Sequence, residues 1–229
     1  MTRVLVIDDH PVVLRGCREI LVNAGATEIV QAQSVAEGFQ LYRKHKPDLI
    51  IVDLAMRSGV LNGLSFVRRL RMHDQQMPLL VFTMHSDPVI VSRALELGAN
   101  GYVLKDASAE EFLTAFQTVR AGKLYLSHDL AADVAFNQAR EKANPIRNLS
   151  LRELQTLALV AEGKPYGVIA KHLGVSYKTV ANVCTQLKAK FGVHTLPELM
   201  RMAIQHLPSI TRLGHAPEGG QKEDSGGES

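Results

Sequence analysis

The sequence predicts an α/β domain with a doubly wound parallel sheet, followed by an all-α domain of four helices. Two observations predict this fold class. Between residue 3 and about residue 121, five short apolar runs alternate with amphipathic segments, which is the pattern of a (βα)5 unit. Residues 149–207 contain amphipathic helical segments and no strand pattern.

The five apolar runs are expected to be parallel strands, because runs that are apolar on both faces are buried between two layers of helices. They cover residues 4–7, 28–32, 49–52, 79–82 and 102–104. The amphipathic segments between them cover residues 11–23, 34–45, 62–73, 87–96 and 108–121. Ser34 with Glu37 and Ser108 with Glu111 have the spacing of capping boxes, so helices are expected to begin there.

We expect a first domain at residues 1–124, a helical linker at 125–147 and a second domain at 148–208. The linker helix should cover residues 127–143, because Pro145 disfavours helical backbone in the residue before it. Residues 209–229 are rich in proline, glycine, serine and charge, and a segment of this composition is expected to be disordered.

The charge distribution and the cysteines limit the class of protein. The net charge is +3, and residues 149–207 carry 7 Lys and Arg against 3 Asp and Glu, which would draw a polyanion to the second domain. Cys17 and Cys184 lie far apart and suit neither a disulfide framework nor a metal site, so we expect a cytoplasmic protein with both cysteines in core positions. No signal peptide or membrane span is recognisable, so no membrane association is expected.

Polar residues stand at the carboxyl ends of four of the five predicted strands: Asp8 and Asp9, Asp53, Thr83, and Lys105. Ligands of parallel sheets gather at this edge, so these side chains are expected to converge. Singly, each has an ordinary structural explanation, since an acidic pair or a threonine can cap a helix and a lysine can be solvated. Their joint placement favours a site.

Three converging carboxylates need a counter-charge, and Mg2+ prefers oxygen ligands of this kind. We assign Asp8, Asp9, Asp53 and the backbone carbonyl of Ala55 as metal ligands. Asp53 is assigned as the nucleophile toward a phosphoryl group, and Thr83 and Lys105 as the groups that stabilise the phosphoryl oxygens.

These residues, with the segment Gly98-Ala99-Asn100-Gly101-Tyr102 before the lysine, resemble the CheY-like receiver family over residues 3–121. The resemblance implies that a histidine kinase phosphorylates Asp53 with the help of Mg2+. It also implies that Thr83 and Tyr102 form a switch, in which the threonine hydroxyl moves toward the phosphoryl group and the tyrosine turns inward. The sequence departs from the family at Arg57, where proline is usual, and the loop over residues 57–62 is about two residues longer.

The second domain has the layout of a helix-turn-helix. Ser150 with Glu153 forms a capping box at the start of its first helix, and Pro165 can begin its second. Gly174 then makes a tight turn, and Ser176 can cap the third helix.

The third helix has two distinct faces. Val180, Cys184, Leu187 and Phe191 have the spacing of a buried stripe. The other face could read the major groove, although such a face is by itself more typical of a solvated helix surface. The candidate DNA-binding residues are Lys178, Thr179, Ala181, Asn182, Thr185, Gln186 and Lys188.

The motifs Leu149-Ser-Leu-Arg-Glu-Leu, Ile169-Ala-Lys-His-Leu-Gly-Val-Ser and Phe191-Gly-Val resemble the LuxR/NarL helix-turn-helix family across residues 149–207. The resemblance implies double-stranded DNA as a partner and a phosphorylation-dependent homodimer. It places the dimer contact on the fourth helix, at Leu199, Met202, Ala203 and Leu207; these apolar residues alone would favour a core position.

The two resemblances together imply a two-component response regulator, in which phosphorylation of Asp53 controls dimerisation and sequence-specific DNA binding. Two alternatives remain at this point. A Mg2+-dependent phosphohydrolase would be an enzyme, but such enzymes place an Asp-x-Asp motif after the first strand, where this chain has adjacent aspartates. A phosphorylation-dependent protein-interaction switch would retain the fold without specific DNA binding.

Overall fold

The computed structural model describes residues 2–56, 61–140 and 145–207 of the chain. The first domain alternates strands and helices as predicted: β1 (Arg3–Ile7), α1 (Pro11–Asn23), β2 (Glu28–Ala32), α2 (Val35–His45), β3 (Leu49–Val52), α3 (Asn62–Arg71), β4 (Leu79–Thr83), α4 (Pro88–Glu96), β5 (Gly101–Leu104) and α5 (Ala109–Arg120). A connecting segment contains β6 (Tyr125–Leu126) and α6 (His128–Arg140). The second domain contains a 3-10 helix (Pro145–Asn148), α7 (Leu151–Ala161), α8 (Tyr166–Leu173), α9 (Tyr177–Phe191) and α10 (Leu196–His206).

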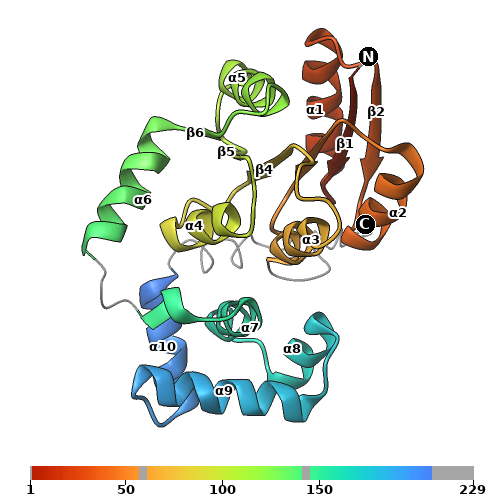
Figure 1. The fold of residues 1–229 in the computed structure, drawn as a ribbon. Coiled ribbons are helices and arrows are strands. Elements are labelled where there is room, and N and C mark those ends of the chain that lie inside the picture. Colours follow the sequence, from red (N-terminus) through yellow and green to blue (C-terminus); the bar gives the residue numbers. More distant parts are fainter. Residues whose placement is uncertain (1, 57–60, 141–144, 208–229) are drawn as a thin grey trace, which may run out of the picture.

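The strands form one parallel sheet in the order β2-β1-β3-β4-β5-β6 (Figure 1). The order reverses between β1 and β3, so the carboxyl ends of these two strands flank the point where ligands bind in doubly wound sheets. Asp8 directly follows β1 and Asp53 directly follows β3. The backbone N–H of Asp53 donates to the carbonyl of Ile7 at 2.9 Å, which holds the two strand ends side by side.

Helices cover both faces of the sheet, which explains why the strands are apolar on both sides (Figure 1). Val4 and Val6 of β1 pack toward α1 and α5, in the cluster that also contains Cys17. Leu5 and Ile7 pack on the opposite side, in the cluster formed with α2, α3 and α4. Each fully buried aliphatic side chain contributes roughly 1.5–3 kcal/mol, so the sheet is the main stabilising element of the domain.

The connecting segment differs from its prediction at one end. Tyr125 and Leu126 pair with Gly101 and Tyr102 of β5, so the first residues of the predicted linker belong to the sheet. A two-residue strand is too short to show a periodicity, which is why the pattern did not predict it. The predicted helix over 127–143 is present as α6, and α6 packs against α4; residues 141–144 lie outside the described ranges.

The second domain begins with the predicted capping box of Ser150 and Glu153. Gly174, with a φ of 63°, ends α8 in the left-handed conformation and so permits the tight turn into α9. Val180, Cys184 and Leu187 of α9 are buried as predicted, whereas Phe191, the last residue of the stripe, is only half-buried.

Helix α10 corrects one expectation. Leu199, Ala203 and Leu207 are fully buried within the domain, so of the four residues expected at a dimer contact only Met202 reaches the surface. The predicted tail over 209–229 and the loop residues 57–60 lie outside the described ranges. Among the helices that the structure describes, none has the length and hydropathy that a membrane span requires.

Candidate functional site

The centre of the site is the ammonium group of Lys105, just after β5. Its Nζ lies 2.7 Å from a carboxylate oxygen of Asp53 and 2.7 Å from one of Asp8. Both carboxylates are 2% exposed and the lysine side chain 7% exposed, so the three charges meet inside the protein. Removing such charges from water is costly, and their close pairing compensates for it. The structure thus brings together predicted residues from three strand ends.

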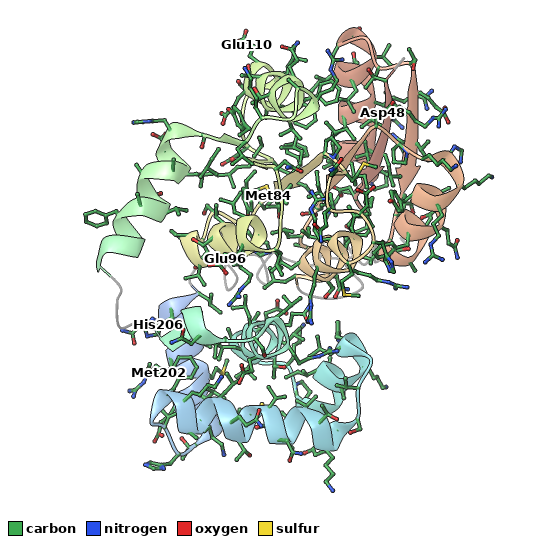
Figure 2. All side chains as sticks on the ribbon, viewed as in Figure 1. Asp48, Met84, Glu96, Glu110, Met202 and His206 are labelled. Carbon is green, nitrogen blue, oxygen red and sulfur yellow. The ribbon has the colours of Figure 1, made fainter. Side chains whose placement is uncertain are left out.

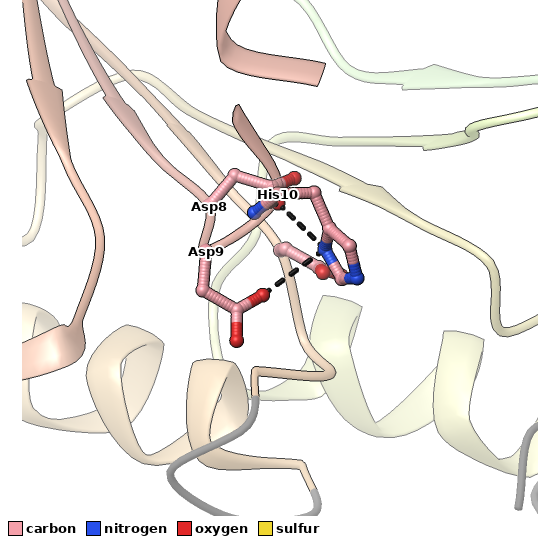
Figure 3. A group of neighbouring side chains, drawn as sticks. Asp8, Asp9 and His10 are labelled. Carbon is pink, nitrogen blue, oxygen red and sulfur yellow. Dashed lines mark hydrogen bonds and ion pairs between the residues drawn. The ribbon is translucent and has the colours of Figure 1, made fainter. Parts of the chain in front are cut away.

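The sequence pattern did not predict one further group that contacts the carboxylates, the side chain of His10. The ring Nδ1 of His10 lies 3.0 Å from an oxygen of Asp8 and 3.0 Å from an oxygen of Asp9 (Figure 3). The His10 backbone N–H also donates to Asp8 at 2.9 Å. The side chains of Asp8, Asp9, His10 and Asp53 offer ligand atoms that all lie within 4.8 Å of one another, a spacing that could hold one cation.

The environment of the site shifts its pKa values. Burial raises the pKa of Asp53, although Lys105 acts in the opposite direction. Burial alone would lower the pKa of Lys105, but the charges and hydrogen bonds of Asp53 and Asp8 outweigh it, and the pKa is raised. The lysine therefore carries a positive charge at neutral pH, and Asp8, Asp9 and Asp53 place three carboxyl groups near it, the type of donor set that binds a divalent cation.

The switch residues predicted beside this pocket are both buried. The hydroxyl of Thr83 has no hydrogen-bond partner among the described residues, so a buried donor remains available at the end of β4. Tyr102 is fully buried, and its hydroxyl donates to the backbone carbonyl of His85 at 2.7 Å. The Tyr102 ring therefore points into the protein, and a backbone carbonyl between β4 and α4 holds its hydroxyl.

His85, two residues after Thr83, is a further buried polar side chain beside the pocket. It is 2% exposed, and neither ring nitrogen has a hydrogen-bond partner within the ranges that the structure describes. Burial and the charge of Lys105 lower the pKa of His85 to about 4, so the ring is neutral near pH 7. Ala55, the predicted carbonyl ligand, lies beside the carboxylates, and its N–H donates to Asp53 at 3.1 Å.

The candidate DNA-binding residues lie on α9, on the side of the second domain away from the sheet (Figure 1). Lys178, Thr179, Asn182, Thr185 and Gln186 are exposed, and Ala181 and Lys188 are half-buried. This arrangement leaves the amide and ammonium groups of the helix accessible to a duplex.

Two protein families match the chain. The family described as "Response regulator receiver domain" matches residues 4–117, and the family described as "Bacterial regulatory proteins, luxR family" matches residues 147–203. The two matches cover the sheet domain with its acidic pocket and the helical domain with α9.

Similar proteins match this chain over nearly their whole length. The methanol utilization control regulatory protein MoxX of Paracoccus denitrificans is 38% identical over 204 residues, which cover 89% of this chain and 92% of the relative. Among solved structures, the Salmonella typhimurium RcsB response regulator is similar with a TM-score of 0.70 and 25% identity over 90% of this chain and 98% of RcsB. RcsB bound to the promoter rprA in the presence of the phosphomimetic BeF3- is similar with a TM-score of 0.65 and 26% identity, over 89% of this chain and 98% of that one.

Proposed function

Since the chain belongs to the response regulators that carry a LuxR-type DNA-binding domain, we propose that Asp53 is its phosphoacceptor and that phosphorylation of Asp53 controls DNA binding. The family regulates transcription and is not a family of enzymes. The observation that carries the proposal is the position of Asp53, whose buried carboxylate lies 2.7 Å from Lys105 at the switch point of the sheet.

The residues of the pocket have complementary roles in phosphoryl transfer. An oxygen of Asp53 forms a bond to phosphorus while the bond from phosphorus to the donor's leaving group breaks, and the leaving group takes the electron pair. Lys105 stabilises the negative phosphoryl oxygens, and the unpartnered hydroxyl of Thr83 can donate a hydrogen bond to one of them. Thr83 and Tyr102 are the switch residues of this proposal.

The donor set fits Mg2+, because it consists mainly of carboxylate oxygens with excess negative charge. Asp8, Asp9, Asp53 and the carbonyl of Ala55 would hold the ion. When bound, Mg2+ supplies positive charge that reduces repulsion between the phosphoryl oxygens and the carboxylates.

Removal of divalent metal is expected to prevent phosphorylation. Purified chain is incubated with acetyl phosphate and Mg2+, and with the same donor after EDTA treatment, and the phosphorylated fraction is measured by intact-mass spectrometry. We expect a loss of at least about 100-fold in the initial rate without metal, the scale of one large electrostatic contribution to catalysis. Restoring excess Mg2+ is the control. An unchanged rate after EDTA treatment would contradict the metal assignment.

We propose a cognate histidine kinase as the phosphodonor, double-stranded DNA as the target and a phosphorylation-dependent homodimer as the active form. The RcsB complex with promoter DNA and a phosphomimetic supports this proposal for a similar protein. We assign the receiver domain to residues 1–124 with β6 as its added edge strand, the linker to the rest of residues 125–147 and the DNA-binding domain to residues 148–208. A regulator of this kind acts where the chromosome lies, which in a bacterium is the cytoplasm.

Two substitutions on α9 should separate base reading from phosphate binding. Asn182→Ala is expected to relax sequence preference by about 1–3 kcal/mol at one base pair, because an asparagine amide can bond adenine at two positions. Lys188→Ala is expected to weaken binding to all duplexes similarly and to lower the salt slope by about one. The measurement is fluorescence anisotropy with selected and scrambled duplexes over a salt series. Equal behaviour of the two variants would refute this division of roles.

A further inference from the structure

The two domains are in direct contact through α7. Every residue of α7 except Arg152 is buried, although the second domain can cover only part of a helix surface. The remaining face of α7 packs toward α3 and α4, and apolar residues of both domains belong to one continuous cluster. Figure 2 shows side chains filling the space between α7 and these two helices.

A buried amide fixes this contact. Gln155 of α7 is 3% exposed, and its Nε2 donates to the hydroxyl of Ser65 at 3.1 Å and to the backbone carbonyl of Leu61 at 3.3 Å. At the edge of the contact, the guanidinium of Arg93 on α4 donates to the carbonyl of Leu149 at 2.6 Å. A buried amide is tolerated when its hydrogen bonds are made, so these bonds specify one arrangement of α7 on the receiver.

The receiver side of this contact adjoins the phosphoacceptor. Gly63, in the first turn of α3, lies so close to the backbone of Asp53 and Leu54 that a Cβ atom at residue 63 would be 2.6 Å from the Leu54 Cα and nearer still to the Asp53 carbonyl. Leu61, two residues before Gly63, has a φ of 56°, a left-handed conformation that is unfavourable for leucine. The turn that begins α3 therefore touches both the backbone of Asp53 and the amide of Gln155.

The contact leaves the DNA-binding face free. Helix α9 lies on the side of the second domain opposite to the receiver (Figure 1), and Lys178, Asn182 and Gln186 are exposed while α7 is docked. Docking through α7 thus does not block the access of a duplex to α9.

We propose that α7 is a docking surface for the N-terminal end of α3 and that Gln155 is the positioning residue of this contact, which we call the joint. We further propose that phosphorylation of Asp53 changes the joint, and that the joint does not cover α9. The effect of phosphorylation rests on the proposed function, because it takes Asp53 as the phosphoacceptor. The other parts concern the unphosphorylated chain alone.

The test uses the unphosphorylated full chain and two variants, one on each side of the joint. Gln155→Leu removes both hydrogen bonds, and Ser65→Ala removes one from a half-buried position where misfolding is not expected. Hydrogen exchange of residues 61–67 and 151–161 should become at least about fivefold faster in Gln155→Leu, because the Leu61 carbonyl and the Ser65 hydroxyl lose the hydrogen bonds from Gln155. The change should be smaller in Ser65→Ala, which loses one of the two bonds. Gln117→Leu, on the exposed surface of α5, is the matched control and should change neither segment.

The DNA affinity of Gln155→Leu then shows whether docking of α7 blocks the access of a duplex to α9. A duplex obtained by selection with the full chain should bind Gln155→Leu within about threefold of the wild type, because α9 is accessible in both states. A gain of tenfold or more in Gln155→Leu would show that docking masks α9 and would overturn the proposal. Unchanged hydrogen exchange in both variants would overturn the joint itself.

Beryllofluoride with Mg2+, a phosphoryl mimic, tests whether a change at Asp53 reaches the contact between α3 and α7. Its addition to the wild type should speed exchange of residues 151–161, as Gln155→Leu does. If beryllofluoride protects the backbone around Asp53 but leaves 151–161 unchanged, the joint does not transmit the state of Asp53. If it changes exchange neither around Asp53 nor in residues 151–161, the proposed function fails instead, and the two failures are thereby distinguished.

Discussion

Replacing Asp53 with asparagine is expected to leave no detectable phosphorylated protein after incubation with acetyl phosphate and Mg2+. The amide has nearly the shape of the carboxylate, but its oxygen is not a nucleophile toward phosphorus, so the step that forms the aspartyl phosphate is lost. Intact-mass spectrometry of the wild type and of Asp53→Asn measures the phosphorylated fraction directly.

Asp48 offers a matched control for this substitution. It lies at the opposite end of β3 from Asp53 and is exposed, and it accepts a hydrogen bond from the backbone N–H of Arg3 at 2.7 Å (Figure 2). Asp48→Asn should be phosphorylated to the same extent as the wild type. Continued labelling of Asp53→Asn at the wild-type rate would show that another residue accepts the phosphoryl group.

Gly63→Ala is expected to cause the largest loss of stability among small substitutions in the receiver. The added methyl group would overlap the backbone of Asp53 and Leu54, which cannot turn aside as a flexible side chain can. Overpacking of this kind costs roughly 1–3 kcal/mol and occasionally more, and here we expect the upper end of that range. The free energy of unfolding, from urea denaturation followed by circular dichroism, is the measurement.

Gly16→Ala is the control for Gly63→Ala. Gly16 lies inside α1, and a Cβ at residue 16 would meet no atom within 4 Å. Because alanine favours the helix more than glycine does, Gly16→Ala should be neutral or should stabilise the domain by up to about 1 kcal/mol. Equal unfolding free energies for the two variants would contradict the close approach of α3 to Asp53.

The sequence predicts most of the first domain because its strands are buried on both faces and their polar residues stand at one edge. Asp8, Asp53 and Lys105 could be placed in one site from strand ends alone, and the structure brings them within hydrogen-bonding distance. His10 could not be placed in this way, since one histidine after an acidic pair shows no periodicity. The one feature of the sequence that could have indicated its place in the site is that His10 directly follows Asp8 and Asp9.

The contact between the domains has no counterpart in a sequence pattern. Gln155 occupies a helix position where a polar residue indicates a solvent-exposed face, and its acceptor Leu61 lies 94 residues earlier in the chain. Only tertiary packing makes this amide a buried group. The same limit applies to Leu199, whose apolar character indicates burial without indicating whether the domain or a second copy buries it.

The most direct test of phosphorylation control is the DNA affinity of the full chain with and without a phosphodonor. A duplex selected by the chain is titrated with wild-type protein and with Asp53→Asn, each before and after incubation with acetyl phosphate and Mg2+. We expect the donor to raise the affinity of the wild type by about tenfold or more, the size of a typical coupling between two sites, and to leave Asp53→Asn unchanged. Equal affinity of the wild type with and without phosphate on Asp53, confirmed by mass, would contradict the control of DNA binding by this residue.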